Sequence, residues 1–143
     1  MDGISSLLRS KGLRVTRIRR KLLEYLYKKK TPDHFESISQ AFEKESDPAT
    51  IYRNLQCFQR LGIVEAHSFG DKKTWYSLVD YNKSHKHFVI CKTCKKVFEL
   101  GACRWDFLNK YIEEKYKFKN VTHQLEFFGI CANCQLTRNL SRA

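Results

Sequence analysis

Two pairs of cysteines, each with two residues between the thiols, constrain this chain more than any other feature. The pairs are Cys91–Cys94 and Cys131–Cys134. This spacing lets both sulfurs of a pair turn toward one point, and two such pairs supply the four soft ligands of a closed tetrahedral zinc site. A closed site is structural, so it predicts how the C-terminal half folds. The function has to be found in the residues around it.

The composition indicates a small, strongly basic protein. A length of 143 residues suits one domain or two small ones, and a small domain with a thin core benefits from a bound metal. The 27 Lys and Arg against 15 Asp and Glu leave a formal net charge of +12, which favours an anionic partner such as nucleic acid. A basic protein without such a partner would carry the same charge, so the motifs have to decide.

Nothing in the sequence indicates secretion or a membrane span. Residues 1–12 hold charges and only short apolar runs, and no apolar stretch of about 18 residues occurs. We therefore expect a cytoplasmic protein with no membrane partner, in which paired cysteines indicate metal rather than disulfides. Cys57 and Cys103 remain outside the pairs; Cys57 lies in an apolar helical stretch, where we expect it to be buried.

Residues 1–80 are predicted to form helices followed by a small hairpin. Thr16 and Asp47 are capping residues at helix starts, and Pro48 suits the first turn of the second of these helices. Apolar residues recur at helical spacing after each start. Residues 63–78 then hold two apolar runs around a turn, which predicts a hairpin. Helices followed by a two-stranded wing indicate a winged helix-turn-helix domain.

Residues 81–84 are polar and are predicted to form a hinge, so that a second domain covers residues 85–143. This second half is predicted as strand, strand, helix, strand: Phe88–Ile90, Val97–Leu100, a helix with Trp105, Leu108, Tyr111 and Ile112, and a long strand Val121–Ile130. The expected fold class is therefore α+β, with an N-terminal winged helix-turn-helix domain and a small α/β domain that holds a three-stranded sheet.

Two groups of residues predict contact with duplex DNA. Residues 9–30 hold ten Lys or Arg against one acid, an array that suits phosphate contacts, although a solvated helix face would look similar. The helix that begins near residue 49 has the place of a recognition helix, whose first turns meet base edges in the major groove. The candidate contacts are Thr50, Tyr52 and Arg53 on this helix and Lys72 and Lys73 in the hairpin turn.

Three of the five histidines fall near the cysteine pairs. His85 and His87 are two residues apart, so on a strand both side chains point to one face. Zn²⁺ and Fe²⁺ take imidazole readily, and His123 with Asp106 would complete a four-ligand site. The alternative is that these histidines lie on the surface without a metal.

Signals for catalysis are weak. The chain has only six glycines and no Gly-rich loop that could cradle a phosphate. A redox CxxC usually opens a helix, which lowers the pKa of its thiol, whereas both pairs here are predicted to follow strands. We therefore expect neither an enzyme nor a small-molecule substrate.

Four segments together resemble the ferric uptake regulator (Fur) superfamily over nearly the whole chain. They are GLRVTRIR at 12–19, ATIYRNL at 49–55, HKHFVICKTC at 85–94 and THQLEFFGIC at 122–131. The resemblance implies a winged-helix DNA-binding domain, a hinge and an α/β dimerisation domain. It also implies a homodimer that binds palindromic operators, usually as a metal-dependent repressor with structural zinc at the four cysteines.

The resemblance implies roles for single residues as well. Tyr52 and Arg53 would lie in the major groove, Arg14 takes the place of a lysine that reaches the minor groove, and Arg19 is the family's helix-start arginine. The four ligands of the family's second metal site match His85, His87, Asp106 and His123, the set already reached from strand geometry.

One family site looks dismantled in this sequence. Members often carry a sensing site at the hinge, and two of its histidines are replaced here by Lys86 and Phe88. Ser77 stands where an acid is expected, and Glu99 matches a remaining ligand. The ammonium group of Lys86 and the phenyl ring of Phe88 cannot ligate Fe²⁺ or Zn²⁺ here.

The working hypothesis is that a divalent metal (Zn²⁺, Fe²⁺ or Mn²⁺) at the second site favours the DNA-binding arrangement of a dimer. A regulator that binds DNA without a regulatory metal, with Lys86 paired to Glu99 in place of the cation, is an alternative. A peroxide-responsive subtype is another. From other classes, a zinc-ribbon RNA-binding protein and a CxxC oxidoreductase remain.

Overall fold

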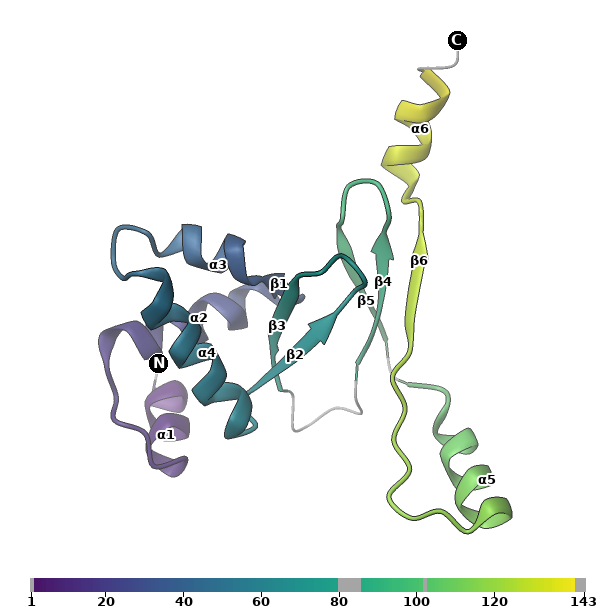
Figure 1. Ribbon diagram of the computed structural model, residues 1–143, viewed down its shortest axis with the longest axis horizontal. Helices are drawn as coiled ribbons and strands as arrows, with labels where there is room; N and C mark the ends of the chain where they lie inside the picture. The colour runs from purple at the N-terminus through teal and green to yellow at the C-terminus, as the bar shows by residue number, and fades with distance from the viewer. Residues whose placement is uncertain (1, 80–85, 102, 141–143) are drawn as a thin grey trace. The chain divides into compact units, whose positions relative to one another are not determined.

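The computed structural model describes residues 2–79, 86–101 and 103–140. The chain divides into two units, Met1–Val79 and Asp80–Ala143, and each is described by itself (Figure 1). The predicted hinge at 81–84 lies outside the described residues. None of the described helices combines the length and apolar character needed to span a bilayer.

The first unit combines helices with a three-stranded antiparallel sheet. Its elements are α1 (Asp2–Ser10), α2 (Arg17–Lys29), β1 (Asp33–His34), α3 (Phe35–Ala41), α4 (Pro48–Arg60), β2 (Val64–Ser68) and β3 (Thr74–Leu78). The strand order is β1-β3-β2, so a short third strand extends the predicted hairpin. The sequence shows only a helix break at the position of β1, because a two-residue strand has no periodicity to detect.

Both predicted helix starts are confirmed. The side chain of Thr16 accepts a hydrogen bond from the backbone N–H of Arg19 at 3.4 Å and caps α2. Asp47 accepts from the backbone N–H of Thr50 at 2.9 Å and caps α4, whose first turn holds Pro48. Each cap satisfies an N–H group that the helix itself leaves without a partner.

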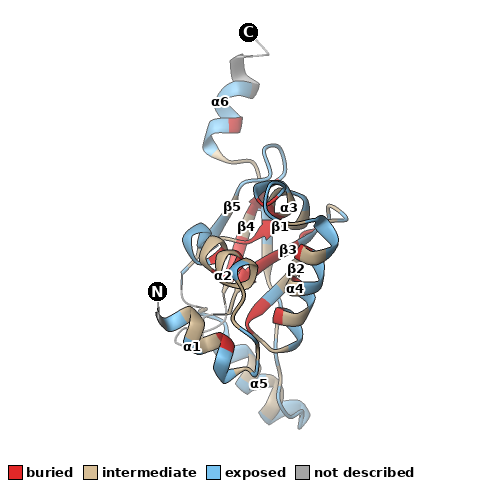
Figure 2. Ribbon diagram, turned by 90° about the vertical axis from the view of Figure 1, so that its left-hand side faces the viewer, coloured by how far each residue is buried: buried red, intermediate tan, exposed pale blue. Residues whose placement is uncertain are grey.

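The apolar residues at helical spacing form the core of the first unit. α2 packs against β3 and α4 packs against β2, and Figure 2 colours the buried residues of the unit red. The core consists of Leu8, Leu22, Leu23, Leu26, Ile38, Phe42, Ile51, Leu55, Phe58, Ile63, Val64 and Tyr76. Because α4 buries Ile51 and Leu55, Tyr52 and Arg53 between them are exposed.

The second unit holds a mixed three-stranded sheet and two helices within its described residues. Its elements are β4 (His87–Cys91), β5 (Val97–Leu100), α5 (Asp106–Tyr116), β6 (Glu126–Gly129) and α6 (Ala132–Leu140). The order is β5-β4-β6; β5 pairs with β4 antiparallel, whereas β6 pairs with β4 in parallel.

The end of the chain differs from the expectation in one respect and adds a helix that was not predicted. The strand predicted over 121–130 covers only β6, because the residues before it turn to α5 instead of the sheet. The backbone N–H of Val121 donates to the Glu113 carboxylate at 3.2 Å, and His123 Nδ1 lies 3.0 Å from Asn109 Oδ1. The second cysteine pair follows the end of β6, as expected, but it also opens helix α6, which was not predicted; the first turn of α6 closes with the N–H of Gln135 on the Cys131 carbonyl at 3.0 Å.

The second unit has a thin apolar core. Among its described residues, the large apolar side chains that are buried are Phe88 and Ile90 on β4. Large apolar side chains are exposed at Phe98, Trp105, Phe107, Leu108, Tyr111, Tyr116, Phe118, Phe127, Phe128 and Leu136. A unit of this size needs support beyond such a core, which bound metal or a covering surface can supply.

Candidate metal centres and DNA-contact residues

The parallel pairing of β4 with β6 brings the two cysteine pairs together. Cys91 at the end of β4 lies opposite Gly129 at the end of β6, so both chains leave the sheet at the same end. Cys94 and Cys131 then come within 3.7 Å of each other, measured between sulfurs. The expected sulfur–sulfur edge of a tetrahedral zinc site is about 3.8 Å, for Zn–S bonds of about 2.3 Å.

All four sulfurs lie within 4.8 Å of one another, so the group Cys91, Cys94, Cys131 and Cys134 could bind a structural zinc ion. Backbone N–H groups of Cys131 and Cys94 lower the pKa of Cys91 to about 5. Hydrogen bonding with the Cys131 sulfur, together with burial, raises the pKa of Cys134 to about 12. A zinc ion binds cysteines as thiolates, so its binding would release the protons that the four sulfurs carry.

A second group of candidate ligands consists of His87, Cys103 and His123. His87 begins β4 and is 5% exposed, Cys103 precedes α5, and His123 precedes β6. The Cys103 sulfur lies 3.2 Å from His87 Nε2 and 3.3 Å from His123 Nε2, and the two Nε2 atoms are 3.0 Å apart. This group could hold a second metal ion.

Hydrogen bonds at the other ring nitrogens orient both imidazoles of this group. His87 Nδ1 donates to the backbone carbonyl of Leu125 at 3.0 Å, since a carbonyl can only accept. His123 Nδ1 faces the side-chain oxygen of Asn109 at 3.0 Å. The Nε2 atoms of both rings then face the Cys103 sulfur. Metal-binding histidines in proteins are held in this way.

The predicted second site and the observed group overlap in two residues. His87 and His123 are brought together, whereas His85 lies outside the described residues. Asp106 begins α5, is exposed, and does not belong to the group of converging ligand atoms among the described residues. Sequence reasoning missed Cys103. The only signal was a leftover cysteine three positions before Asp106.

Lys86, which replaces a histidine of the family's sensing site, forms an ion pair with Glu99, which matches a remaining ligand of that site. Lys86 Nζ lies 3.0 Å from Glu99 Oε2, and both side chains are partly exposed. Glu99 lies on β5 opposite Phe88 on β4. A lysine therefore meets the carboxylate that the family resemblance assigned to a metal.

The predicted DNA contacts fall into two classes in the structure. Arg14, Tyr52, Arg53 and Lys72 are exposed, and Lys73 is half-buried in the β2–β3 turn. The Thr50 hydroxyl instead donates a hydrogen bond to Asp47 at 2.7 Å.

Arg19 also forms hydrogen bonds inside the first unit. Its Nε donates to Asn54 Oδ1 at 3.0 Å, and its Nη1 donates to the Arg14 carbonyl at 2.9 Å. Asn54 in turn donates to the Thr50 carbonyl at 2.8 Å, so Arg19 joins the start of α2 to α4.

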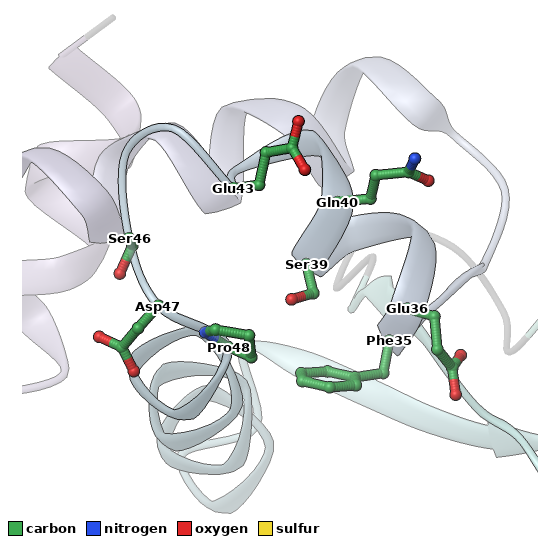
Figure 3. A pocket seen from close by; sticks show the side chains of 8 residues that line it. All are labelled: Phe35, Glu36, Ser39, Gln40, Glu43, Ser46, Asp47 and Pro48. Atoms are coloured by element: carbon green, nitrogen blue, oxygen red, sulfur yellow. The ribbon is translucent and has the colours of Figure 1, made fainter.

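An open hollow of about 610 Å³ lies between α3 and α4 (Figure 3). It is lined by Phe35, Glu36, Ser39, Gln40, Glu43, Ser46, Asp47 and Pro48. The carboxylates of Glu36, Glu43 and Asp47 do not suit a DNA phosphate. None of the basic residues predicted to contact DNA lines this hollow.

The chain is similar to known regulators of one class. Residues 10–128 match the ferric uptake regulator family. The peroxide-responsive repressor PerR of Staphylococcus aureus (strain Mu50 / ATCC 700699) is 29% identical over 137 residues, which cover 94% of this chain and 90% of that protein. The PerR of Staphylococcus saprophyticus is 31% identical with the same coverage.

Solved structures share the fold. The ferric uptake regulator of Vibrio cholerae superposes with a TM-score of 0.75 at 29% identity and covers 88% of this chain and 98% of its own. A zinc uptake regulator solved with zinc and DNA superposes with a TM-score of 0.67, covering 94% of this chain and 92% of its own. At 20% identity that second likeness concerns the fold alone.

Proposed function

Because the chain belongs to the ferric uptake regulator family, we propose that it is a cytoplasmic, dimeric, metal-dependent DNA-binding regulator that acts as a repressor and not as an enzyme. The observation that carries this proposal is the pair of ligand groups in the second unit, four cysteines and His87–Cys103–His123. Relatives that are named repressors support the direction of regulation.

The first unit is proposed to be the DNA-binding domain, with α3 and α4 as the helix-turn-helix and β2–β3 as the wing. The N-terminal turns of α4 would enter the major groove of a palindromic operator, with Tyr52 and Arg53 at the bases. Backbone contacts would add to this. The proposed contact set is Arg14, Arg19, Thr50, Tyr52, Arg53, Lys72 and Lys73. Its support is the burial of Ile51 and Leu55, which turns the opposite face of α4 outward.

The second unit is proposed to be the dimerisation domain, with a second copy of the chain covering its apolar surface. Phe127 and Phe128 are 42% and 44% exposed and lie on β6, an edge strand of the sheet. Exposed aromatic side chains beside an edge strand invite pairing with another chain. A twofold dimer would also present two copies of α4 to two half-sites.

The metal proposal assigns different work to the two ligand groups. Zinc at the four cysteines would hold α6 to the end of the sheet and stay bound. A divalent ion at the second site would be the exchangeable one. We keep His85 and Asp106 as further candidate ligands beside His87 and His123. Such an ion regulates DNA binding only to the extent that it binds the DNA-competent state more tightly than the other.

Metal analysis combined with operator binding tests the proposal. We expect one tightly held zinc per chain after dialysis, and DNA affinity that rises about tenfold to a hundredfold when Zn²⁺, Fe²⁺ or Mn²⁺ is added back. His123→Ala should abolish this response while the tightly held zinc remains. Gln124→Ala, at the exposed residue next to His123, is the matched control. Equal DNA affinity with and without every metal would discard metal sensing.

A second candidate function is DNA binding that needs no regulatory metal. The Lys86–Glu99 ion pair favours it, because an ammonium group then supplies the charge that a cation would supply. Under this proposal metal-free protein binds operator fully, and Lys86→Gln weakens binding at least tenfold. Lys96→Gln is the control for the loss of one positive charge. A Lys86→Gln variant that binds normally without metal would reject this role.

A further inference from the structure

We propose that Cys103 is a ligand of the second metal site and makes it select thiophilic cations, such as Zn²⁺ and Co²⁺, over Mn²⁺. This inference rests on the proposed function, since it names the ion class that the exchangeable site would take. It departs from the predicted ligand set, in which all donors were imidazole nitrogens and a carboxylate. A cysteine sulfur in place of the Asp106 carboxylate changes which metal ions the site prefers.

The three donor atoms form a small triangle of the right size. Its edges are 3.0, 3.2 and 3.3 Å. A tetrahedral zinc with Zn–N bonds of about 2.0 Å and a Zn–S bond of about 2.3 Å requires edges of about 3.3 to 3.6 Å. An ion above the triangle therefore needs the donors to move apart by only a few tenths of an ångström. Three protein ligands leave a fourth position for water or a further side chain.

The surroundings favour a cation over an ordinary thiol–imidazole contact. The Nδ1 atoms of both rings are held by Leu125 and Asn109, and this places the two Nε2 atoms 3.0 Å apart beside the Cys103 sulfur. A bound cation can take both Nε2 atoms as ligands at once. The backbone N–H of Trp105 also donates to the Cys103 sulfur at 3.4 Å and helps to fix its position.

The site is also reachable from outside. A hollow of about 330 Å³ is lined by His87, Leu100, Gly101, Cys103, Arg104, Trp105, Leu125 and Phe127. An ion can therefore meet His87 and Cys103 without unfolding of the unit. His87 itself is buried, so the bound ion would be held on the protein side of the hollow.

The ligand set decides which ion is preferred. A thiolate with two imidazoles suits zinc and other thiophilic metals, whereas Mn²⁺ prefers carboxylate, carbonyl and water oxygens. The site should therefore rank Zn²⁺ and Co²⁺ well above Mn²⁺. Replacing the sulfur by a carboxylate should narrow that difference, because the donors would then be nitrogen and oxygen only.

The test is a cobalt titration of dialysed full-length protein that holds one zinc per chain. We expect the second equivalent, Co²⁺, to produce a sulfur-to-cobalt charge-transfer absorption in the wild type. Cys103→Ser should lose this absorption and about tenfold to a hundredfold of its Co²⁺ and Zn²⁺ affinity. Cys103→Asp should lose the absorption too and raise the Mn²⁺ affinity relative to Zn²⁺. Cys57→Ser, at the other leftover cysteine, should behave as wild type.

A wild type that binds Co²⁺ at the second site without the charge-transfer absorption overturns the proposal, whether or not any variant folds. An unchanged Zn²⁺-to-Mn²⁺ preference in a folded Cys103→Asp variant overturns it as well. The proposed function fails by a different measurement. If the charge-transfer absorption appears but operator affinity never responds to the ion, Cys103 is a ligand in a protein that does not sense metal.

Discussion

Asp33 shows how a single buried residue ties three elements of the first unit together. The residue is 4% exposed and lies on β1. Its Oδ2 accepts hydrogen bonds from the Tyr25 hydroxyl of α2 and the Ser37 hydroxyl of α3, and it pairs with Lys29 Nζ at 3.1 Å. A buried carboxylate is tolerated only with partners of this kind.

Replacing Asp33 by alanine should destabilise the first unit by about 3 kcal/mol, because the Tyr25, Ser37 and Lys29 donors lose their shared acceptor. The measurement is urea unfolding followed by the fluorescence of buried Trp75 in a Trp105→Phe background. Glu24→Ala is the control, because its pair with Arg20 is partly exposed and spaced i,i+4. That control should cost about 0.5 kcal/mol or less. Equal losses for both variants would contradict the role given to Asp33.

The same residue predicts a pH dependence. Burial alone would raise the pKa of Asp33, but hydrogen bonds from Tyr25, Lys29 and Ser37 outweigh it and hold the pKa below the ordinary value of 3.8. The stabilisation by Asp33 is therefore complete above about pH 4 and is lost as the pH falls through the lowered pKa. Asp33→Asn should make unfolding less dependent on pH below about pH 4. If the free energy of unfolding falls as steeply with acid in the variant as in the wild type, other carboxylates cause the pH dependence.

At the scale of elements, a residue that was predicted to touch DNA makes a hydrogen bond between α2 and α4. Arg19 bonds Asn54 on α4 and the Arg14 carbonyl ahead of α2. Its geometry indicates that it sets the position of α4 relative to α2.

Arg19→Lys separates these two roles, because it keeps the charge and loses the Nε bond to Asn54. We expect DNA affinity to fall several-fold while its dependence on salt concentration stays the same. Arg53→Ala should instead reduce the slope of log affinity against log salt by about 1 if Arg53 contacts a phosphate. The measurement is operator binding across a salt series. An Arg19→Lys variant with wild-type DNA affinity would mean that Arg19 acts only through its charge and does not position α4.

The second unit shows how elements can depend on bound metal and on a covering surface. α6 begins between Cys131 and Cys134, and α5 buries none of its described residues. Among the residues of these two helices whose burial is described, the buried one is Cys134. We therefore attribute the anchoring of α6 to the cysteine group.

At the scale of the whole molecule, the exposed aromatic residues of the second unit predict self-association. Phe128→Glu places a charge on the edge strand β6 and should convert the proposed dimer to monomers at micromolar concentration. Sedimentation velocity measures this directly. Tyr27→Glu, at a 71% exposed aromatic residue of the first unit, should leave the dimer intact. A Phe128→Glu protein that remains a dimer would place the interface elsewhere.

Interactions between residues close in the sequence determined the helix starts, the buried helix faces and the cysteine pairs of this protein. The caps at Thr16 and Asp47, the helical spacing of the apolar residues and the two CxxC pairs were readable because each depends on residues a few positions apart. These signals also carried the family resemblance. They predicted a mixed α/β chain, which the structure confirms, and four cysteines able to share one ion.

Only the tertiary structure decided which distant side chains meet. Parallel pairing of β6 with β4 and the turn of residues 121–125 toward α5 bring His123 to His87 and Cys103. No spacing in the sequence marks Cys103 as a partner of either histidine. The same holds for Arg19 and Asn54, which are 35 positions apart. Periodicity reports which face of an element is buried, whereas the partner across a gap depends on how strands pair and helices pack.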